Sequence, residues 1–330
     1  MSKVLRIGTR GSALALWQAN ETKRLIESLP GAPAVELVII KTQGDLQQDI
    51  PLWKTPGKGF FTAELDRAQL DKEVDVVVHS LKDLATVMTP GLALTAVLER
   101  EDPRDALVVR GGLTPLSLDS RAFTARDGGD LDSLPKGARI GTSSLRRRAF
   151  LAHARPDLKH MELRGNVPTR VKKLDDGVYD AIILATAGLK RLGLENRVSY
   201  RLPTSGFPNA VAQGIIGICT REGDAETDRW VAPLNHTESR IAADAERGLL
   251  RKLEGGCQVP VGALATLSGD TVTLYSAACN LDGSDFVAAE GSAPLVDAAK
   301  LGVRVAEDLL NRGATSVLAE ANARRQAVQH

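Results

Sequence analysis

The sequence predicts an α/β protein with two similar doubly wound domains and a small α+β domain at its C-terminal end. The chain resembles itself at three places in the same order. Apolar, strand-like runs alternate with stretches of helical periodicity over both copies. After about residue 236 the pattern changes to one helix followed by alternating strands.

The internal repeat carries most of this prediction. In the first pair, RIGTRGSALALWQA matches RIGTSSLRRRAFLA, each a short strand, then Gly-Thr, then a helical stretch. The matched pairs are 6–19 with 139–152, 35–45 with 160–166, and 74–84 with 179–192. Three matches in order predict two copies of one domain.

Each copy contains a nearly continuous apolar run, at 76–78 and at 182–184. Such runs are typical of buried parallel strands with helices on both faces. Residues 64–70 carry the helical periodicity expected between strands. Since ligands of doubly wound sheets bind beyond the carboxyl ends of the strands, we expect a cleft between the two copies.

Charged or turn-rich linkers at 99–105 and 203–209 bracket the second copy. The strand-like residues 214–219 then return to the first domain, and residues 111–133 form a surface excursion. The expected domains are 1–100 with 213–233, then 104–209, then 237–330.

In the third domain a helix over 236–253 leads into a Gly-Gly-Cys loop that contains Cys257. Alternating strands follow, with a hairpin turn at 282–284. A final amphipathic helix carries apolar residues over 301–310.

Composition excludes several classes of function. A formal net charge of +1 and 4% aromatic residues argue against a nucleic-acid binder. No segment is apolar for long enough to span a bilayer, and no signal peptide is recognisable. Three sparse cysteines favour a reducing compartment, and five histidines without zinc-ligand spacing predict no metal. We expect a cytoplasmic monomer.

The two Gly-Thr segments, residues 8–12 and 141–144, are candidate anion sites. Each places backbone N–H groups and hydroxyls at the start of a helix, where the helix dipole favours negative charge. The alternative is ordinary helix capping by a hydroxyl. The residues concerned are Ser12, Thr142 and Ser144, with Arg10 beside one copy and Arg146, Arg147 and Arg148 beside the other.

Further arginines follow predicted strands of the second copy: Arg164, Arg170 and Arg191. Arginine pairs bidentately with carboxylate or phosphate, so this cluster predicts an anionic ligand. The alternative is a solvated basic face. The spacing does not distinguish phosphate from carboxylate, although a P-loop nucleotide site is excluded because its motif is missing.

Asp83 follows the apolar strand of the first copy, next to Lys82 and opposite the arginine-rich copy. A carboxylate there can accept a proton or stabilise a developing cation. On spacing alone, a helix N-cap is an equally good interpretation.

Cys257 follows two glycines, which let a bulky group approach its sulfur. A lone cysteine is also often a small buried hydrophobe, which is our interpretation of Cys219 and Cys279. The polar loop over 42–59 is a candidate lid or simply a surface loop.

Together these residues resemble the porphobilinogen deaminase family of tetrapyrrole biosynthesis. The matching runs are TRGSALALWQA, KGFFTAELD, VVVHSLKDL, REDPRDALV, GTSSLRRR, LRGNVPTR, DAIILATAGLKRLGL, AVAQGIIGI and RKLEGGCQVPVGA. The resemblance implies two domains like type II periplasmic binding proteins and a third domain that holds a dipyrromethane cofactor through a thioether to Cys257. It also implies a reaction in which porphobilinogen loses ammonia and four units condense into hydroxymethylbilane.

The resemblance further implies roles for single residues. Asp83 is the catalytic residue that stabilises cationic pyrroles. The expected cofactor-binding residues are Cys257, Lys82, Ser12, Thr142, Ser144, Arg146 and Arg147. The expected residues for the growing chain are Arg10, Arg164, Arg170, Arg191, Gln213 and Phe61.

A few positions depart from the family pattern, among them Ala85, Thr86, Pro168, Ala212 and Cys219. They put details of turn geometry in doubt and remove no charged group. Two other functions fit parts of the sequence: a binding module for small anions, and an RNA-binding protein that uses the Arg146 cluster. The Cys257 domain and the missing signal peptide argue against the first, and net charge argues against the second.

Overall fold

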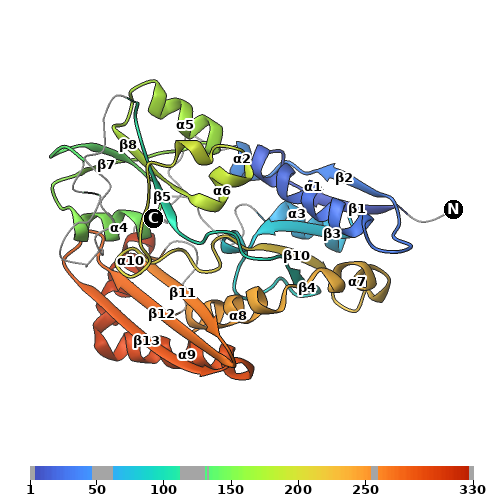
Figure 1. Ribbon diagram of the computed structural model, residues 1–330. Helices are drawn as coiled ribbons and strands as arrows, with labels where there is room; N and C mark the ends of the chain where they lie inside the picture. Colours follow the sequence, from blue (N-terminus) through green and yellow to red (C-terminus); the bar gives the residue numbers. More distant parts are fainter. Residues whose placement is uncertain (1–3, 47–61, 112–130, 132–133, 254–258, 327–330) are drawn as a thin grey trace.

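The structure is a computed structural model that describes residues 4–46, 62–111, 131, 134–253 and 259–326. Its strands form two five-stranded sheets and one three-stranded sheet (Figure 1). We call the two five-stranded sheets with their helices the first and second units, and the remainder the third unit. The first two units contain the two copies of the internal repeat.

The first sheet has the order β2-β1-β3-β10-β4. Strand β1 pairs in parallel with β2 and β3, whereas β10 runs antiparallel to β3 and β4. Its strands are β1 (Leu5–Thr9), β2 (Val35–Ile39), β3 (Val76–Ser80), β4 (Leu92–Val97) and β10 (Ile216–Arg221). The predicted return of residues 214–219 to the first sheet is therefore confirmed.

The second sheet repeats this plan with the order β7-β6-β8-β5-β9. Strand β6 is parallel to β7 and β8, and β5 is antiparallel to β8 and β9. Its strands are β5 (Asp105–Val109), β6 (Arg139–Gly141), β7 (Lys159–Met161), β8 (Ala181–Ala185) and β9 (Tyr200–Arg201). The prediction of parallel strands was half right, because β3 and β8 each have one parallel and one antiparallel neighbour.

Helices cover both faces of these sheets, as the doubly wound pattern predicts. In the first unit, Val76 and Val78 pack with residues of α1, while Val77 on the opposite face packs with α3. The helices are α1 (Ala13–Glu27), α2 (Gln43–Leu46), α3 (Ala63–Leu70) and α7 (Ala225–Val231) in the first unit, and α4 (Leu145–Ala154), α5 (Val167–Asp175) and α6 (Thr186–Arg191) in the second. Short 3₁₀ turns include η2 (Leu81–Asp83), η4 (Glu195–Arg197) and η5 (Ala232–Leu234).

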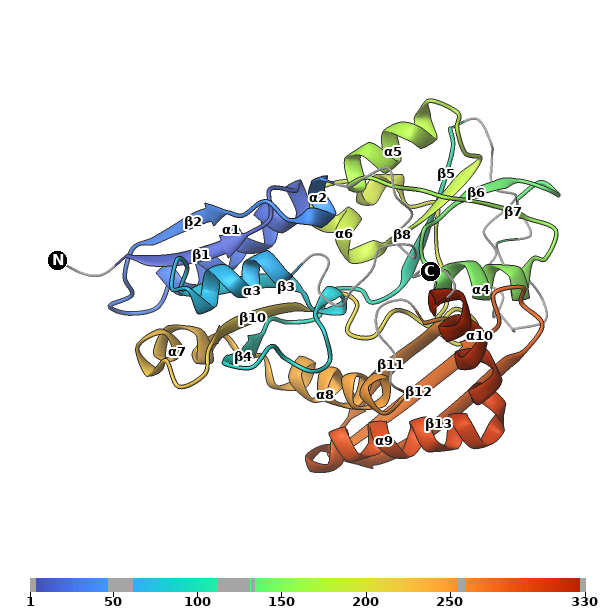
Figure 2. The same ribbon diagram turned by 180° about the vertical axis from the view of Figure 1, so that it is seen from behind.

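The third unit is an antiparallel sheet with helices on one face (Figure 2). Its elements are α8 (Thr237–Lys252), β11 (Val261–Ser268), β12 (Thr271–Cys279), β13 (Phe286–Pro294), a 3₁₀ turn (Leu295–Asp297), α9 (Ala298–Leu309), a π-helical turn (Leu310–Ala314) and α10 (Thr315–Gln326). The predicted helix and hairpin are confirmed. The amphipathic helix is not the last one, because the chain kinks at Gly313, with φ of 112°, and continues as α10.

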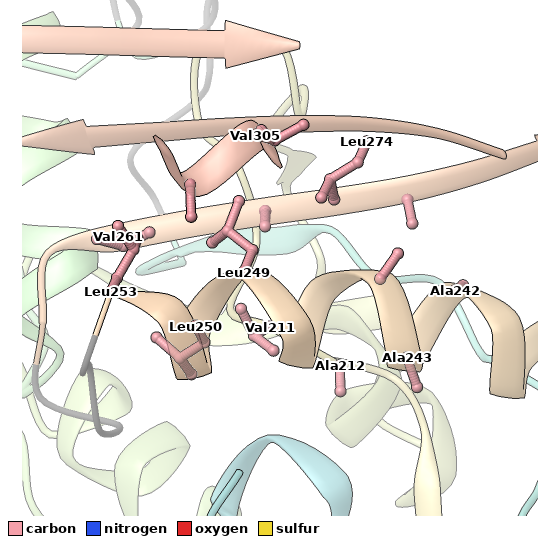
Figure 3. Packing of buried hydrophobic residues seen from close by; sticks show 14 of the residues in the cluster. Val211, Ala212, Ala242, Ala243, Leu249, Leu250, Leu253, Val261, Leu274 and Val305 are labelled. Atoms are coloured by element: carbon pink, nitrogen blue, oxygen red, sulfur yellow. The ribbon is translucent and has the colours of Figure 1, made fainter. Parts of the chain in front are cut away.

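The two faces of β12 join the third unit to the rest of the molecule. Leu274 packs in one core with Leu249 of α8 and Val305 of α9 (Figure 3). Val272 and Ala278 of the same face belong to this core, which also contains Leu81 of the first unit. Residues of the opposite face, such as Ala277, pack in the core of the second unit. Because successive side chains of a strand point to opposite faces, alternate residues of β12 enter two different cores.

Two crossing segments, 98–104 and 209–215, connect the first and second units. They lie side by side, since the N–H of Glu101 donates to the Gly214 carbonyl at 3.1 Å. Gly214 has φ of +92°, and a Cβ there would lie 2.3 Å from the Glu101 carbonyl oxygen. This close approach requires glycine.

Helix α8 holds both crossing segments through one buried carboxylate, Glu246. It pairs with Arg100 at 2.5 Å and accepts the N–H of Ala212 at 2.6 Å. Ala212, where the family usually has glycine, has φ of 59°, a strained conformation for a residue with a Cβ. The hydrogen bond to Glu246 holds this strained residue in place. Ala212 belongs to the crossing segment 209–215, which connects the two units.

Candidate functional site

The two Gly-Thr segments end in helix caps. Ser12 Oγ accepts the N–H of Ala15 at 3.3 Å, and Ser144 Oγ accepts the N–H of Arg147 at 3.4 Å. Thr142 Oγ1 accepts the N–H of Ser144 at 3.3 Å. The capping interpretation is therefore confirmed for both copies, while anion binding by these groups stays a prediction.

Arg146 and Arg147, on the first turn of α4, are buried around the carboxylate of Asp105 at the start of β5. Arg146 Nη2 lies 2.7 Å from Asp105 Oδ2, and Arg147 Nη2 lies 2.7 Å from Asp105 Oδ1. Arg147 also donates to the Ile183 carbonyl, and Arg146 to the Pro208 carbonyl. Burial opposes ionisation of Asp105, but the two guanidiniums outweigh it and hold the pKa of that carboxyl well below its usual range.

Gln213 connects this buried cluster to Lys82 of the first unit. Its Nε2 donates to Asp105 Oδ1 at 2.9 Å and to the Pro103 carbonyl at 2.8 Å. Its Oε1 accepts from Lys82 Nζ at 3.2 Å. Burial, together with the charges of Arg146 and Arg147, lowers the pKa of Lys82 to about 8 against the opposing effect of nearby carboxylates. The site is thus one hydrogen-bonded cluster drawn from both units.

Asp83 lies at the exposed edge of this cluster. Strand β3 ends at Ser80, and the buried Leu81, whose N–H donates to the Ile215 carbonyl at 2.9 Å, fixes the turn that follows. Asp83 is the last residue of this turn and its side chain is exposed, so the N-cap interpretation is wrong. Its charge raises the pKa values of both Lys82 and Arg170, which places it close to cations of both units.

Arg164 and Arg170 flank the start of α5. Arg170 Nε donates to the Gly165 carbonyl at 2.7 Å. Burial, and then the charges of Arg147 and Arg164, lower the pKa of Arg170 to about 10. Burial also lowers the pKa of Arg164. Pro168, a departure from the family pattern, stands in the first turn of α5, where no N–H partner is lost.

Arg191 belongs to the second unit, and Arg10, directly after β1, belongs to the first. Arg191, the last residue of α6, donates from Nη2 to the Gly214 carbonyl at 2.7 Å, and burial lowers its pKa to about 10. Arg10 lies near the buried His79 of β3, whose pKa is lowered to about 4 by burial and by the Arg10 charge. The described site residues therefore gather where the two units meet.

Comparison with known families decides what this site belongs to. The model of the porphobilinogen deaminase dipyrromethane cofactor binding domain matches residues 5–229. The model of the porphobilinogen deaminase C-terminal domain matches residues 241–311. The chain belongs to the porphobilinogen deaminase family. It is therefore a hydroxymethylbilane synthase of tetrapyrrole biosynthesis, a transferase that works with a dipyrromethane cofactor.

Solved structures that the chain is similar to include several binding proteins. The methionine binding protein MetQ has 14% identity and a TM-score of 0.43, over 70% of this chain and 89% of its own. The sulfonate binding protein SsuA from Escherichia coli has 13% identity and a TM-score of 0.39, over 77% of this chain and 71% of its own. The arginine-specific periplasmic binding protein STM4351 from Salmonella typhimurium has 13% identity and a TM-score of 0.36, over 71% of this chain and 92% of its own.

Several predicted features lie outside the described residues. They include Cys257, between α8 and β11, Phe61, most of the candidate lid over 42–59, and most of the excursion over 111–133. Leu131, at the end of that excursion, is fully buried in the second core. Cys219 and Cys279 are buried, and burial raises the pKa of each thiol to about 12, which confirms their interpretation as small apolar residues.

Within the described ranges, no group of three or more acidic, histidine or cysteine side chains is placed to hold a metal ion. No helix in the same ranges is both long and apolar enough to cross a membrane.

Sequence reasoning missed Asp105 and Glu246. Both are fully buried carboxylates that hold arginines, Asp105 those of α4 and Glu246 that of a crossing segment. Asp105 stands in the EDPRD run, which the sequence pattern indicates as a linker and the family resemblance matches without a role for Asp105. The apolar Ala-Leu-Val-Val run directly after it was a signal that Asp105 begins a buried strand.

Proposed function

We propose that this chain performs the family's reaction with Asp83 as its catalytic residue and Cys257 as the anchor of the dipyrromethane cofactor. One observation carries the assignment of Asp83. It is an exposed carboxylate at the edge of a cluster whose buried charged groups are mostly cations from two units. A carboxylate in that place can stabilise positive charge on a pyrrole while cations hold the pyrrole's own carboxylates.

The cations fit a ligand rich in carboxylates. Porphobilinogen carries an acetate and a propionate, so each condensation adds two negative charges to the site. Burial lowers the pKa values of Lys82, Arg170 and Arg191 more than nearby protein carboxylates raise them. Carboxylates of the ligand would oppose this effect of burial and favour the charged forms.

We assign the cofactor's carboxylates to Lys82, Ser12, Thr142, Ser144, Arg146 and Arg147. The carboxylates of the growing chain fall to Arg10, Arg164, Arg170, Arg191 and Gln213, with Phe61 beside the chain. When bound, dipyrromethane supplies the nucleophilic pyrrole carbon on which the chain starts. Asp83 hydrogen-bonds pyrrole N–H groups and offsets the positive charge that develops when porphobilinogen loses ammonia.

The proposed domains are 1–100 with 213–233, 104–209 and 237–330. Three observations support these boundaries: each contains one sheet, the crossing segments fall between them, and α8 begins the third. We propose that the protein acts as a cytoplasmic monomer. One chain supplies cations from both units to the site, and its three sparse cysteines suit a reducing compartment.

Intact-mass measurement of the purified protein tests the anchor. We expect the wild-type mass to exceed that of the bare chain by two linked porphobilinogen units, and we expect Cys257→Ser to lack this excess. The matched control is Cys219→Ala, which removes a buried thiol of strand β10 in the first unit and should keep the excess. A folded, active wild-type chain of unmodified mass would overturn the proposal.

A further inference from the structure

Trp17 of helix α1 is one of the few large apolar side chains that the described residues leave exposed. Its exposed fraction is 37%, whereas its neighbours Gln18 and Ala19 on the same helix are buried. A half-exposed indole can present its face to a cation. The guanidinium carbon of Arg191, on the second unit, stands 5.6 Å from the centre of the Trp17 ring.

The contact bridges the two units. Trp17 belongs to α1 and Arg191 ends α6, and these helices lie next to each other in both views (Figures 1 and 2). A Cβ at Gly188 of α6 would lie 3.6 Å from Leu14 Cδ2 of α1, so the helices touch one turn away from the indole. The relative position of the units therefore fixes where the guanidinium meets the ring.

Arg191 is held differently from the buried arginines of α4. Asp105 accepts two N–H groups of Arg147, at 3.1 and 2.7 Å, and so occupies the hydrogen-bonding edge of that guanidinium. The Arg191 guanidinium instead lies over the Trp17 ring as a cation–π partner, and an indole has no carboxylate oxygen to occupy the hydrogen-bonding edge of the guanidinium. The Gly214 carbonyl takes one of the five N–H groups.

The protein carboxylate that acts on Arg191 is engaged with other groups. Glu101, whose charge raises the pKa of Arg191, binds Lys190 Nζ at 2.9 Å and the N–H of Asp102 at 2.9 Å. An aromatic ring and one carbonyl therefore orient Arg191. That carbonyl belongs to Gly214, the residue after Gln213 of the site. An edge that is oriented in advance is what bidentate binding of a carboxylate requires.

We propose that Trp17 is a positioning residue that holds Arg191 ready for a carboxylate of the growing pyrrole chain. This inference rests on the proposed role of Arg191 in binding that chain. Trp17 touches no reacting atom and acts through Arg191. Trp17 belongs to the first unit, and it would position an arginine of the second unit that binds the ligand.

The test compares Trp17→Leu, Trp17→Phe and Arg191→Gln in the holoenzyme. We expect Trp17→Leu to raise KM for porphobilinogen about fivefold, equivalent to about 1 kcal/mol of cation–π contact, with kcat within about twofold of wild type. Trp17→Phe keeps an aromatic face and should restore most of the KM. In the double variant Trp17→Leu with Arg191→Gln, the tryptophan change should add little to the effect of Arg191→Gln.

Trp230→Leu is the matched control. Trp230 also lies against an arginine, Arg229 at 4.6 Å, but both belong to α7, away from the site. Its KM should match wild type. The thermal midpoint of each variant and tryptophan fluorescence with and without Arg191→Gln give readouts independent of turnover, since a cation on the indole face alters its emission.

The outcomes separate the two proposals. If Arg191→Gln leaves KM unchanged, the role of Arg191 in the proposed function fails. If Arg191→Gln raises KM but Trp17→Leu does not, only the inference about Trp17 fails. Effects of Trp17→Leu and Arg191→Gln that simply add would also contradict it, because residues acting through one contact are not additive.

Discussion

The first and second units share one ion pair at the end of the sheet away from the site, which we call the base of the unit. They differ at the opposite edge, which carries the site. At the base, the backbone N–H and Nε of Arg6 bind Asp75 Oδ2 at 3.0 and 3.2 Å. The same atoms of Arg139 bind Asp180 Oδ2 at 2.9 and 3.1 Å. One ion pair thus joins the first strand of each repeat to the residue before its third strand.

At the opposite edge the repeats diverge. The first unit contributes Asp83, an exposed carboxylate, after β3. In the second unit α6 follows β8 and ends in Arg191, while α4 starts with buried arginines paired to Asp105. The duplicated scaffold has therefore placed a lone carboxylate opposite a set of cations. This difference suits a reaction that develops positive charge on a polyanionic substrate.

Asp83→Asn, which removes the charge that distinguishes the first unit, should have the largest effect. The amide keeps the size of the side chain but cannot offset positive charge, so we expect kcat to fall about 10²–10⁴-fold. Asp71→Asn, an exposed aspartate at the end of α3, is the control and should retain wild-type kcat. Steady-state kinetics measure both, and wild-type rates for Asp83→Asn would refute its assignment.

Arg147→Met tests whether the second unit depends on its buried cations for stability as well as for binding. Removing this guanidinium leaves the buried Asp105 with one arginine fewer, so the free energy of unfolding should fall by about 3–5 kcal/mol. Arg148 is exposed, and Arg148→Met should change it by less than about 0.5 kcal/mol. Urea unfolding of both variants measures the difference, and equal stabilities would show that the Asp105 cluster does not hold the unit together.

His79 is an acid-sensitive buried position of the first unit, and at the matching position of the second unit the repeat places the buried Leu184. Burial and Arg10 depress the pKa of His79 from 6.5 to about 4, so between these values the unfolded chain binds a proton that the folded chain does not. Stability is therefore full above pH 6.5 and falls by up to about 3 kcal/mol as the pH drops to 4.

His79→Leu copies the second unit and should remove this part of the acid loss. Urea unfolding at several pH values between 7 and 4 measures it. Parallel pH profiles for the variant and the wild type would mean that His79 does not titrate as described.

Lys72 and Gly177 give the smallest expected effect. Both carbonyls accept from the arginine of the base, Arg6 or Arg139, and both residues have positive φ, 61° and 79°. Lysine is strained in that conformation and glycine is not, so Lys72→Gly should raise the free energy of unfolding by about 0.5 kcal/mol. Gly177→Ala should lower it by about 1 kcal/mol. Urea unfolding measures both changes. If the two substitutions changed the free energy of unfolding in the same direction, the turns at Lys72 and Gly177 would not be equivalent.

Local sequence patterns predicted much of the fold. The repeat, the return of β10 to the first sheet and the hairpin after β12 are written in neighbouring residues. The direction of β5 and β10 was not predicted, because an apolar run reports burial and not which neighbours the strand will have.

The partners of the site residues were harder to predict. Asp105 lies 42 residues from Arg147, and Glu246 lies 146 residues from Arg100, so these pairs form only through tertiary packing. The cation–π contact between Trp17 and Arg191 likewise depends on how the two units meet. Sequence patterns predicted which charges gather at the site but not which of them the protein itself neutralises.

The central claim is that the first unit supplies the reacting carboxylate, while cations that mostly belong to the second unit hold the chain. An intact-mass time course after addition of excess porphobilinogen, on holoenzyme of Asp83→Asn and of Arg170→Gln, tests it most directly. We expect Asp83→Asn to keep the mass of its bound dipyrromethane with almost no added pyrroles at any concentration. Arg170→Gln should add pyrroles once porphobilinogen is raised. Addition of pyrroles by Asp83→Asn at the wild-type rate would contradict the claim.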